Sequence, residues 1–164
     1  MALTSSVSVN LRSTIGWYEI AGGTVGVALT AYAALRGTAL PGENVRVAIA
    51  PFTALVLAGW RLRRGGPRSR WPSIAMQLVQ LFFFSAAGYG WKFTGGLLVS
   101  VSAVESQLKL FAGLDASFIT AWHAVGQPFV VGLNVVPLVL LVLLARLNEA
   151  DAAVPKQAAP ASAA

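Results

Sequence analysis

The chain has 164 residues, of which 56% are hydrophobic and only 11% are charged, and its formal net charge is +6. Soluble domains carry about a quarter charged residues, so this composition predicts an integral, polytopic membrane protein. The sequence contains no cysteine, which excludes disulfides, thiolate metal sites and cysteine nucleophiles.

Four apolar segments are each interpreted as a membrane-spanning helix, because about 20 residues rising 1.5 Å each cross roughly 30 Å of hydrocarbon. The spans are predicted at about 15–35, 45–62, 73–91 and 118–146. Pro51 lies near the middle of the second span and predicts a kink. A short polar segment, 1–14, comes first, and the transmembrane domain occupies 15–147. The Ala/Pro-rich tail, 148–164, has nothing to bury and is expected to be disordered.

The stretch between the third and fourth spans is ambiguous. Gly95–Val104 is apolar but too short to cross a bilayer as a helix. Its Val99–Ser102 portion alternates as a strand does, yet apolar residues also recur at helical steps of three and four. These helical positions are Val101, Val104, Leu108 and Phe111. The helical spacing favours an amphipathic helix on the outer surface. The predicted fold class is therefore all-α, a four-transmembrane-helix bundle with a short amphipathic outer segment between helices 3 and 4.

The basic residues predict an orientation for this bundle. Five arginines fall between the second and third spans, which is typical of a cytoplasmic loop rather than a nucleic-acid-binding face. They are Arg61, Arg63, Arg64, Arg68 and Arg70. With four spans both termini then lie in the cytoplasm, and the predicted location is the inner membrane of a bacterium. The expected partners are the lipid bilayer and either other membrane-protein subunits or a second copy of the chain, and no nucleic acid is expected.

A charged residue inside the first span is the most unusual feature of the sequence. Glu19 shares a helical face with small residues that let another helix approach closely. These residues are Gly22, Gly23 and Gly26. A buried carboxylate needs hydrogen-bond donors, and Gln77, Gln80 and Arg61 are predicted at a similar depth. We therefore predict a polar clasp in which Glu19 bonds one of these three side chains. The alternative is a carboxylate that handles protons or cations.

The element Glu19-x-x-Gly22-Gly23 resembles part of the DoxX-type membrane proteins, which carry a Glu/Gly-Gly element in a four-helix bundle of similar size. The match is confined to these three residues, in the first predicted span. The resemblance implies a four-helix bundle, and no function is transferred from it.

A second group of polar residues follows helical spacing in the fourth span and consists of His123, Gln127 and Asn134. Steps of four and seven residues place them on one helical face. One interpretation is a hydrogen-bonded polar stripe, and the alternative is that His123 is an axial ligand for haem or chlorophyll. One histidine without cysteine does not form an ordinary zinc site. We therefore assign no cofactor, no metal site and no catalytic residue.

The leading functional hypothesis is a non-enzymatic structural or accessory subunit of a membrane complex, assembled by small-residue helix packing. The first alternative is a small oligomeric transporter or channel that uses Glu19 or the polar stripe at His123. The second alternative is a membrane redox protein that binds haem or chlorophyll through His123.

Overall fold

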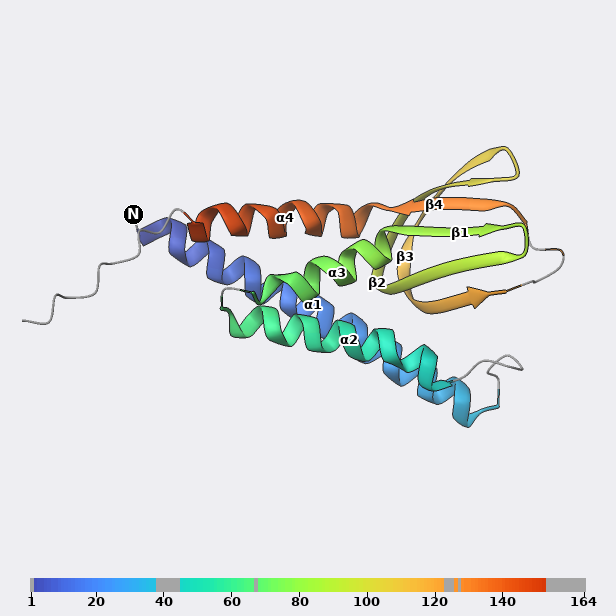
Figure 1. Cartoon of the computed structure of the whole chain (residues 1–164), viewed down its shortest axis with the longest axis horizontal. Helices are drawn as coiled ribbons and strands as arrows, with labels where there is room; N and C mark the ends of the chain where they lie inside the picture. The colour runs from blue at the N-terminus through green and yellow to red at the C-terminus, as the bar shows by residue number, and fades with distance from the viewer. Residues whose placement is uncertain (1, 38–44, 67, 123–125, 127, 153–164) are drawn as a thin grey trace, which may run out of the picture.

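The described residues form a group of helices at one side of the molecule and a group of strands at the other (Figure 1). The computed structural model describes residues 2–37, 45–66, 68–122, 126 and 128–152. In chain order the elements are α1 (Ala2–Leu35), α2 (Val45–Arg64), α3 (Arg70–Leu81), β1 (Phe82–Ala86), β2 (Tyr89–Val104), β3 (Gln107–Ala121), β4 (Val130–Asn134) and α4 (Val135–Ala152). Helix α1 thus begins within the polar segment predicted before the first span, and α4 extends into the predicted tail.

The all-α prediction is wrong, because residues 82–134 contain a four-stranded antiparallel sheet. The third predicted span is divided between α3, β1 and the beginning of β2. The fourth predicted span includes the end of β3, all of β4 and most of α4. Short apolar runs fit a buried strand as well as a helix, and the hydrogen-bond partners of a strand can lie far away in the sequence. The aromatic run Phe82–Phe84 suits a strand.

The amphipathic helix predicted between helices 3 and 4 is also wrong, because its residues belong to β2 and β3, which a tight turn joins. Side chains alternate between the two faces of β2: Leu98 and Ser100 are buried, whereas Val101 is 36% exposed. The turn residues Glu105 and Ser106 have φ angles of 45° and 73°, as the two central residues of a type I′ hairpin turn require. The strand-like alternation is therefore the informative pattern in this segment.

No helix in the described part of the chain combines the length and the apolar character that a membrane crossing requires. Helix α3 has only 12 residues, and α2 ends in arginines. The four predicted spans, the multi-pass inner-membrane location and the four-helix bundle implied by the DoxX resemblance are contradicted. The hypothesis of a membrane-complex subunit is contradicted with them, and its transporter, channel and membrane redox alternatives depend on the same spans.

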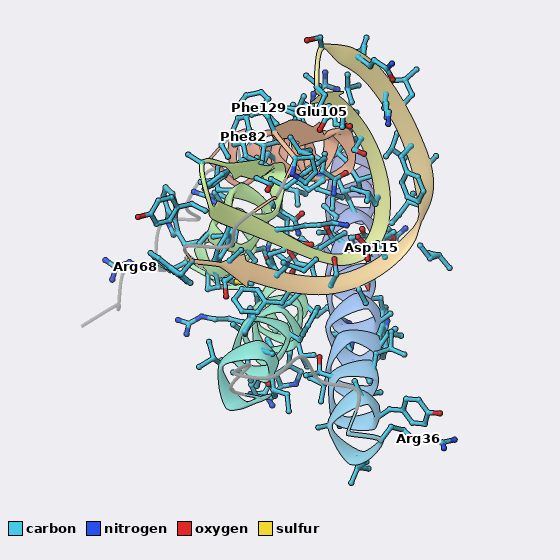
Figure 2. The ribbon with its side chains drawn as sticks, turned by 90° about the vertical axis from the view of Figure 1, so that its right-hand side faces the viewer. Arg36, Arg68, Phe82, Glu105, Asp115 and Phe129 are labelled. Atoms are coloured by element: carbon cyan, nitrogen blue, oxygen red, sulfur yellow. The ribbon has the colours of Figure 1, made fainter. Side chains whose placement is uncertain are left out.

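The sheet is strongly bent. Its strand order is β1-β4-β2-β3, and β1 also pairs with the beginning of β2. Because β2 pairs with β1 up to Trp91 and with β4 from Ser100 onward, β2 bends between these positions. Gly95 and Gly96 lie there, and Gly96 has a φ of +127°, which residues with a side chain rarely adopt. The hairpin of β2 and β3 consequently sweeps in a wide arc (Figure 2).

Two clusters of buried side chains form the core. One joins α1, α2 and α4 and contains Ile15, Leu62, Leu144 and Leu147. The other joins α2 to β2 and contains Phe52, Leu55 and Phe93. The ring centroids of Phe52 and Phe93 lie 5.3 Å apart, within the range of favourable aromatic pairs. The second cluster therefore fixes the sheet against the helices.

Candidate functional site

The structure buries Glu19 completely and gives each of its carboxyl oxygens a donor on α3. Oε2 accepts a hydrogen bond of 2.7 Å from the hydroxyl of Ser73, and Oε1 accepts one of 2.8 Å from Nε2 of Gln77. The exposed fractions of Glu19, Ser73 and Gln77 are 0%, 0% and 1%. These two hydrogen bonds join α1 to α3 inside the helical part of the molecule, and we call them the Glu19 clasp.

Of the three partners predicted for Glu19, Gln77 is the one that bonds it. Gln80 lies further along α3, where its Oε1 accepts a 2.8 Å hydrogen bond from the backbone N–H of Gly95. Arg61 is exposed at the end of α2 and forms no hydrogen bond or ion pair with Glu19 in the described structure. Ser73 is not among the predicted partners, although it precedes Gln77 by four residues and therefore lies on the same face of α3.

The glycines of α1 allow α2 and the sheet to approach this helix closely. A Cβ at Gly23 would lie 2.7 Å from the carbonyl oxygen of Phe52, and one at Gly26 would overlap the Phe52 ring. A Cβ at Gly22 would overlap the carbonyl of Gly95 on β2. Gly23 and Gly26 therefore face α2, whereas Gly22 faces the sheet. The glycines predicted as one packing seam thus contact two different neighbours.

Burial is the main cause of the raised pKa of Glu19. Removing the carboxyl from water raises its pKa from 4.5 to about 7, and the hydrogen bonds from Ser73 and Gln77 lower the pKa only in part. A substantial fraction of the molecules therefore carries a protonated Glu19 at neutral pH. The pKa of Tyr18 is also raised, because burial outweighs its hydrogen bond to the backbone of Leu97 and the charge of Glu19 adds to the rise.

A groove of about 290 Å³ lies beside the clasp, between α1 and the hairpin of β2 and β3. Val25 and Leu29 line it on α1, and Leu97 and Leu114 line it on the hairpin. Tyr18 also lines the groove, and its hydroxyl accepts a 3.0 Å hydrogen bond from the backbone N–H of Leu97. The walls of the groove are therefore mainly apolar.

Asp115 supplies the carboxylate in the lining of this groove. Its Oδ2 lies 2.6 Å from Nζ of Lys92 and accepts a 3.1 Å hydrogen bond from the hydroxyl of Ser117. The Asp115 side chain is 20% exposed. Within the described structure no hydrogen bond reaches Oδ1. The lining of the groove thus combines apolar side chains with a carboxylate whose Oδ1 has no donor in the described structure.

Arginines and tryptophans gather where α2 leads into α3, a region that we call the Arg–Trp corner. The pairs, with distances from the guanidinium carbon to the ring centroid, are Arg63 on Trp17 at 3.9 Å, Arg64 on Trp60 at 3.6 Å and Arg70 on Trp71 at 5.9 Å. These tryptophans are exposed. A cation over an aromatic ring is attracted by the negative face of the ring, so each of these cation–π pairs needs no further partner to hold it.

The polar stripe predicted at His123, Gln127 and Asn134 is described only in part, because His123 and Gln127 lie outside the described residues. Asn134 is buried between β4 and α4. Its Oδ1 accepts hydrogen bonds from the backbone N–H groups of Val136 and Val99, at 3.2 and 3.3 Å. Asn134 therefore caps α4 and also ties it to β2. Among the described residues no group of three or more His, Asp or Glu is arranged to hold a metal ion.

The far part of the β2–β3 hairpin presents a wholly apolar face. Residues directly opposite each other in a hairpin share a face, and the pairs are Val99 with Ala112, Val101 with Leu110 and Ala103 with Leu108. We call these six residues the hairpin face. Leu108 is 74% exposed and Leu110 is 77% exposed. Lys109 lies between these leucines and points to the opposite face, because successive side chains of a strand alternate.

Comparison with known proteins gives no assignment for either the groove or the hairpin face. No family model, no curated protein and no solved structure matches the chain. The contacts, burial and charges described above are therefore the basis on which a function is assigned.

Proposed function

We propose that the chain is a non-enzymatic module that associates with a second copy of itself through the hairpin face. One observation carries the proposal: all six side chains of this face are apolar, and none of them is buried in a single copy. Contiguous exposed apolar patches mark interaction sites, because leaving such area in water is unfavourable.

A second copy fits this face for reasons of symmetry. A two-fold axis brings the same patch of two subunits together, so a uniformly apolar patch is its own complement. Two sheets packed in this way lie about 10 Å apart, with their side chains interdigitated. Lys109 remains in solvent on the opposite face, so the association buries no charge from the middle of the hairpin.

The position of β3 in the sheet supports the same partner. It is the last strand in the order β1-β4-β2-β3, and in the described part of the chain no strand pairs with its outer edge. Long apolar edge strands are templates for pairing with another chain. The unpaired edge and the hairpin face both include residues of β3.

We expect the association to be moderate in strength. Full burial of a leucine side chain contributes roughly 1.5–3 kcal/mol, and Leu108 and Leu110 from two copies give roughly 6–12 kcal/mol in total. The cost of bringing two molecules together is about 4–15 kcal/mol. Because these quantities nearly cancel, we expect a concentration-dependent equilibrium rather than a permanent dimer.

The absence of an enzymatic role is part of the proposal and is supported by the state of the two acidic side chains described above. Glu19 has no exposed surface, so a substrate in solvent does not touch it. Asp115 is held in an ion pair with Lys92. We also propose no nucleic-acid partner, because Arg63, Arg64 and Arg70 lie over tryptophan rings at the Arg–Trp corner rather than along a groove. The lipid bilayer and membrane subunits predicted as partners depended on the four spans and are not proposed.

Sedimentation velocity over a range of protein concentrations tests the self-association. We expect the wild type to shift from monomer to dimer as the concentration rises, and Leu110→Asp to remain monomeric because it places a charge in the hairpin face. The matched control is Phe111→Asp, since Phe111 is the next residue, is 55% exposed and points to the opposite face. A wild type that stays monomeric at every concentration, or a Phe111→Asp variant that loses association while Leu110→Asp retains it, contradicts the proposal.

A further inference from the structure

We propose that the groove between α1 and the β2–β3 hairpin binds a small molecule with an apolar body and a neutral hydrogen-bond donor at one end, as in a medium-chain alcohol. This site is separate from the hairpin face, and the inference does not rest on self-association. The groove begins where the hairpin face ends, at the pair Leu97 and Leu114.

The size of the groove limits the ligand. Its volume is about 290 Å³, close to the lower limit of roughly 300 Å³ for small-molecule pockets. A water molecule occupies about 30 Å³ in the liquid, so the groove holds a ligand of about ten non-hydrogen atoms. A sugar chain, a nucleotide or a folded peptide is too large for this volume.

The walls of the groove select an apolar body. Val25 and Leu29 are each 51% exposed on the α1 side, and Leu114 is 87% exposed on the β3 side. Gly22 and Gly96 also line the groove, and a Cβ at Gly22 would overlap the carbonyl of Gly95, so α1 lies directly against β2 there. A ligand lying between α1 and β3 would remove these three apolar side chains from water, which is the main source of binding free energy for such sites.

The polar end of the ligand is selected by Asp115. Its Oδ2 is occupied by Lys92 and Ser117, whereas Oδ1 has no hydrogen-bond donor in the described structure. The other polar side chain in the lining, Tyr18, both donates to and accepts from the backbone of Leu97. Among the side chains of the lining, Oδ1 of Asp115 is thus an acceptor without a donor, and the proposed ligand donates to it.

The charges around Asp115 favour a neutral donor. Lys92 lies 2.6 Å from Oδ2 and already balances the negative charge of the carboxylate. An ammonium group would compete with Lys92 and would lose its own hydration, while a carboxylate would lie next to Asp115 and be repelled. A hydroxyl group satisfies Oδ1 without either cost, and it loses little hydration on entering the groove.

The test uses 1-octanol, which has nine non-hydrogen atoms, about the number that the groove holds. Backbone amide shifts of Gly22, Leu97 and Asp115 are followed by NMR during titration, and the dissociation constant is obtained by calorimetry. Methyl heptyl ether has the same number of non-hydrogen atoms but no donor, and octanoate carries a negative charge. We expect 1-octanol to bind about tenfold more tightly than either, because a hydrogen bond to a charged group is lost with both.

Two protein variants locate the binding. Val25→Trp fills the groove from α1 and is expected to weaken 1-octanol binding at least tenfold. Its matched control is Val139→Trp on α4, because Val139 is equally exposed, at 51%, and does not line the groove. Circular dichroism confirms that both variants are folded. Equal binding by wild type and Val25→Trp, or no amide shift up to the solubility limit of the alcohol, overturns the proposal.

Binding is also measured in the Leu110→Asp variant, which separates this inference from the proposed self-association. We expect 1-octanol to bind this variant as it binds the wild type, since Leu110 does not line the groove. If the wild type remains monomeric but binds the alcohol, self-association is wrong and the groove assignment stands. If the wild type dimerises but neither protein binds the alcohol, the groove assignment is wrong.

Discussion

The buried carboxyl of Glu19 predicts that the protein loses stability as the pH rises. Its pKa in the folded state is about 7, raised from 4.5 by burial, so the folded state binds the proton more tightly than the unfolded state does. The stability that this group contributes is therefore fully present below pH 4.5 and is lost as the pH rises through about 7. At about 1.4 kcal/mol for each tenfold change in proton affinity, the loss is about 3 kcal/mol.

The variant Glu19→Gln isolates this effect because glutamine has the same shape and no charge. Its amide N–H can donate to the hydroxyl of Ser73, which then turns toward the carbonyl oxygen of Ala58, 3.4 Å away. Its Oε1 can still accept from Gln77. Glutamine thus reproduces the hydrogen bonds of the protonated acid at every pH. We expect Glu19→Gln and the wild type to be about equally stable at pH 4, and the variant to be more stable by up to about 3 kcal/mol at pH 8.5.

Urea unfolding at a series of pH values from 4 to 8.5 measures the difference in stability between Glu19→Gln and the wild type. Subtracting the unfolding free energy of the wild type from that of Glu19→Gln cancels the other ionisable groups, which are the same in both proteins. Glu105→Gln is the control, since Glu105 is an exposed turn residue and its variant should follow the wild type at every pH. A difference that stays constant across the series, or a wild type that gains stability with rising pH relative to Glu19→Gln, refutes the reasoning.

Two further predictions concern the contacts of α1. Gly26→Ala should destabilise the fold by about 1–2 kcal/mol in urea unfolding despite the better helix propensity of alanine, because its Cβ would overlap the ring of Phe52. The control is Thr24→Ala on the exposed side of α1, which should change stability by less than about 0.5 kcal/mol. Equal effects of the two substitutions would contradict the packing argument. Tyr18→Phe removes the hydroxyl that bonds the N–H of Leu97, so it should cost about 1 kcal/mol and speed hydrogen exchange of the Leu97 amide, whereas an unchanged exchange rate would show that this bond is unimportant.

The sequence indicates the unusual position of Glu19 but only some of its surroundings. A carboxylate among apolar residues and glycines needs donors, and an amide on another helix is a natural partner, which is why Gln77 is among the residues considered. Ser73 is missed because its hydrogen bond to Glu19 depends on which face of α3 turns toward α1, and that is decided by the packing of the helices. Gln80 shares that face by spacing, yet its Oε1 accepts from the backbone N–H of Gly95, because β2 passes beside the end of α3 in the folded chain.

The sheet is not predicted because each of its strands, taken alone, is compatible with a helix. The Phe82–Phe84 run continues the apolar pattern of α3, and all three phenylalanines become part of a strand by pairing with Leu133, Gly132 and Val131. This pairing joins residues about fifty positions apart, and periodicity within one segment contains no information about it. The β2–β3 hairpin differs in that its partners are close in the chain and the alternation from Val99 to Ser102 is visible in the sequence.

The polar contacts of α1, α3 and β2 form one connected set, which explains why a charge is retained beside so many small residues. Gln77 and Gln80 lie on the same helix, and one bonds Glu19 on α1 while the other bonds Gly95 on β2. Helix α1 in turn reaches β2 directly, where Tyr18 bonds Leu97. Each pair of these three elements is thus joined by at least one hydrogen bond. The groove lies next to this set and shares Tyr18 and Leu97 with it, so the contact that ties α1 to β2 also forms part of the groove lining.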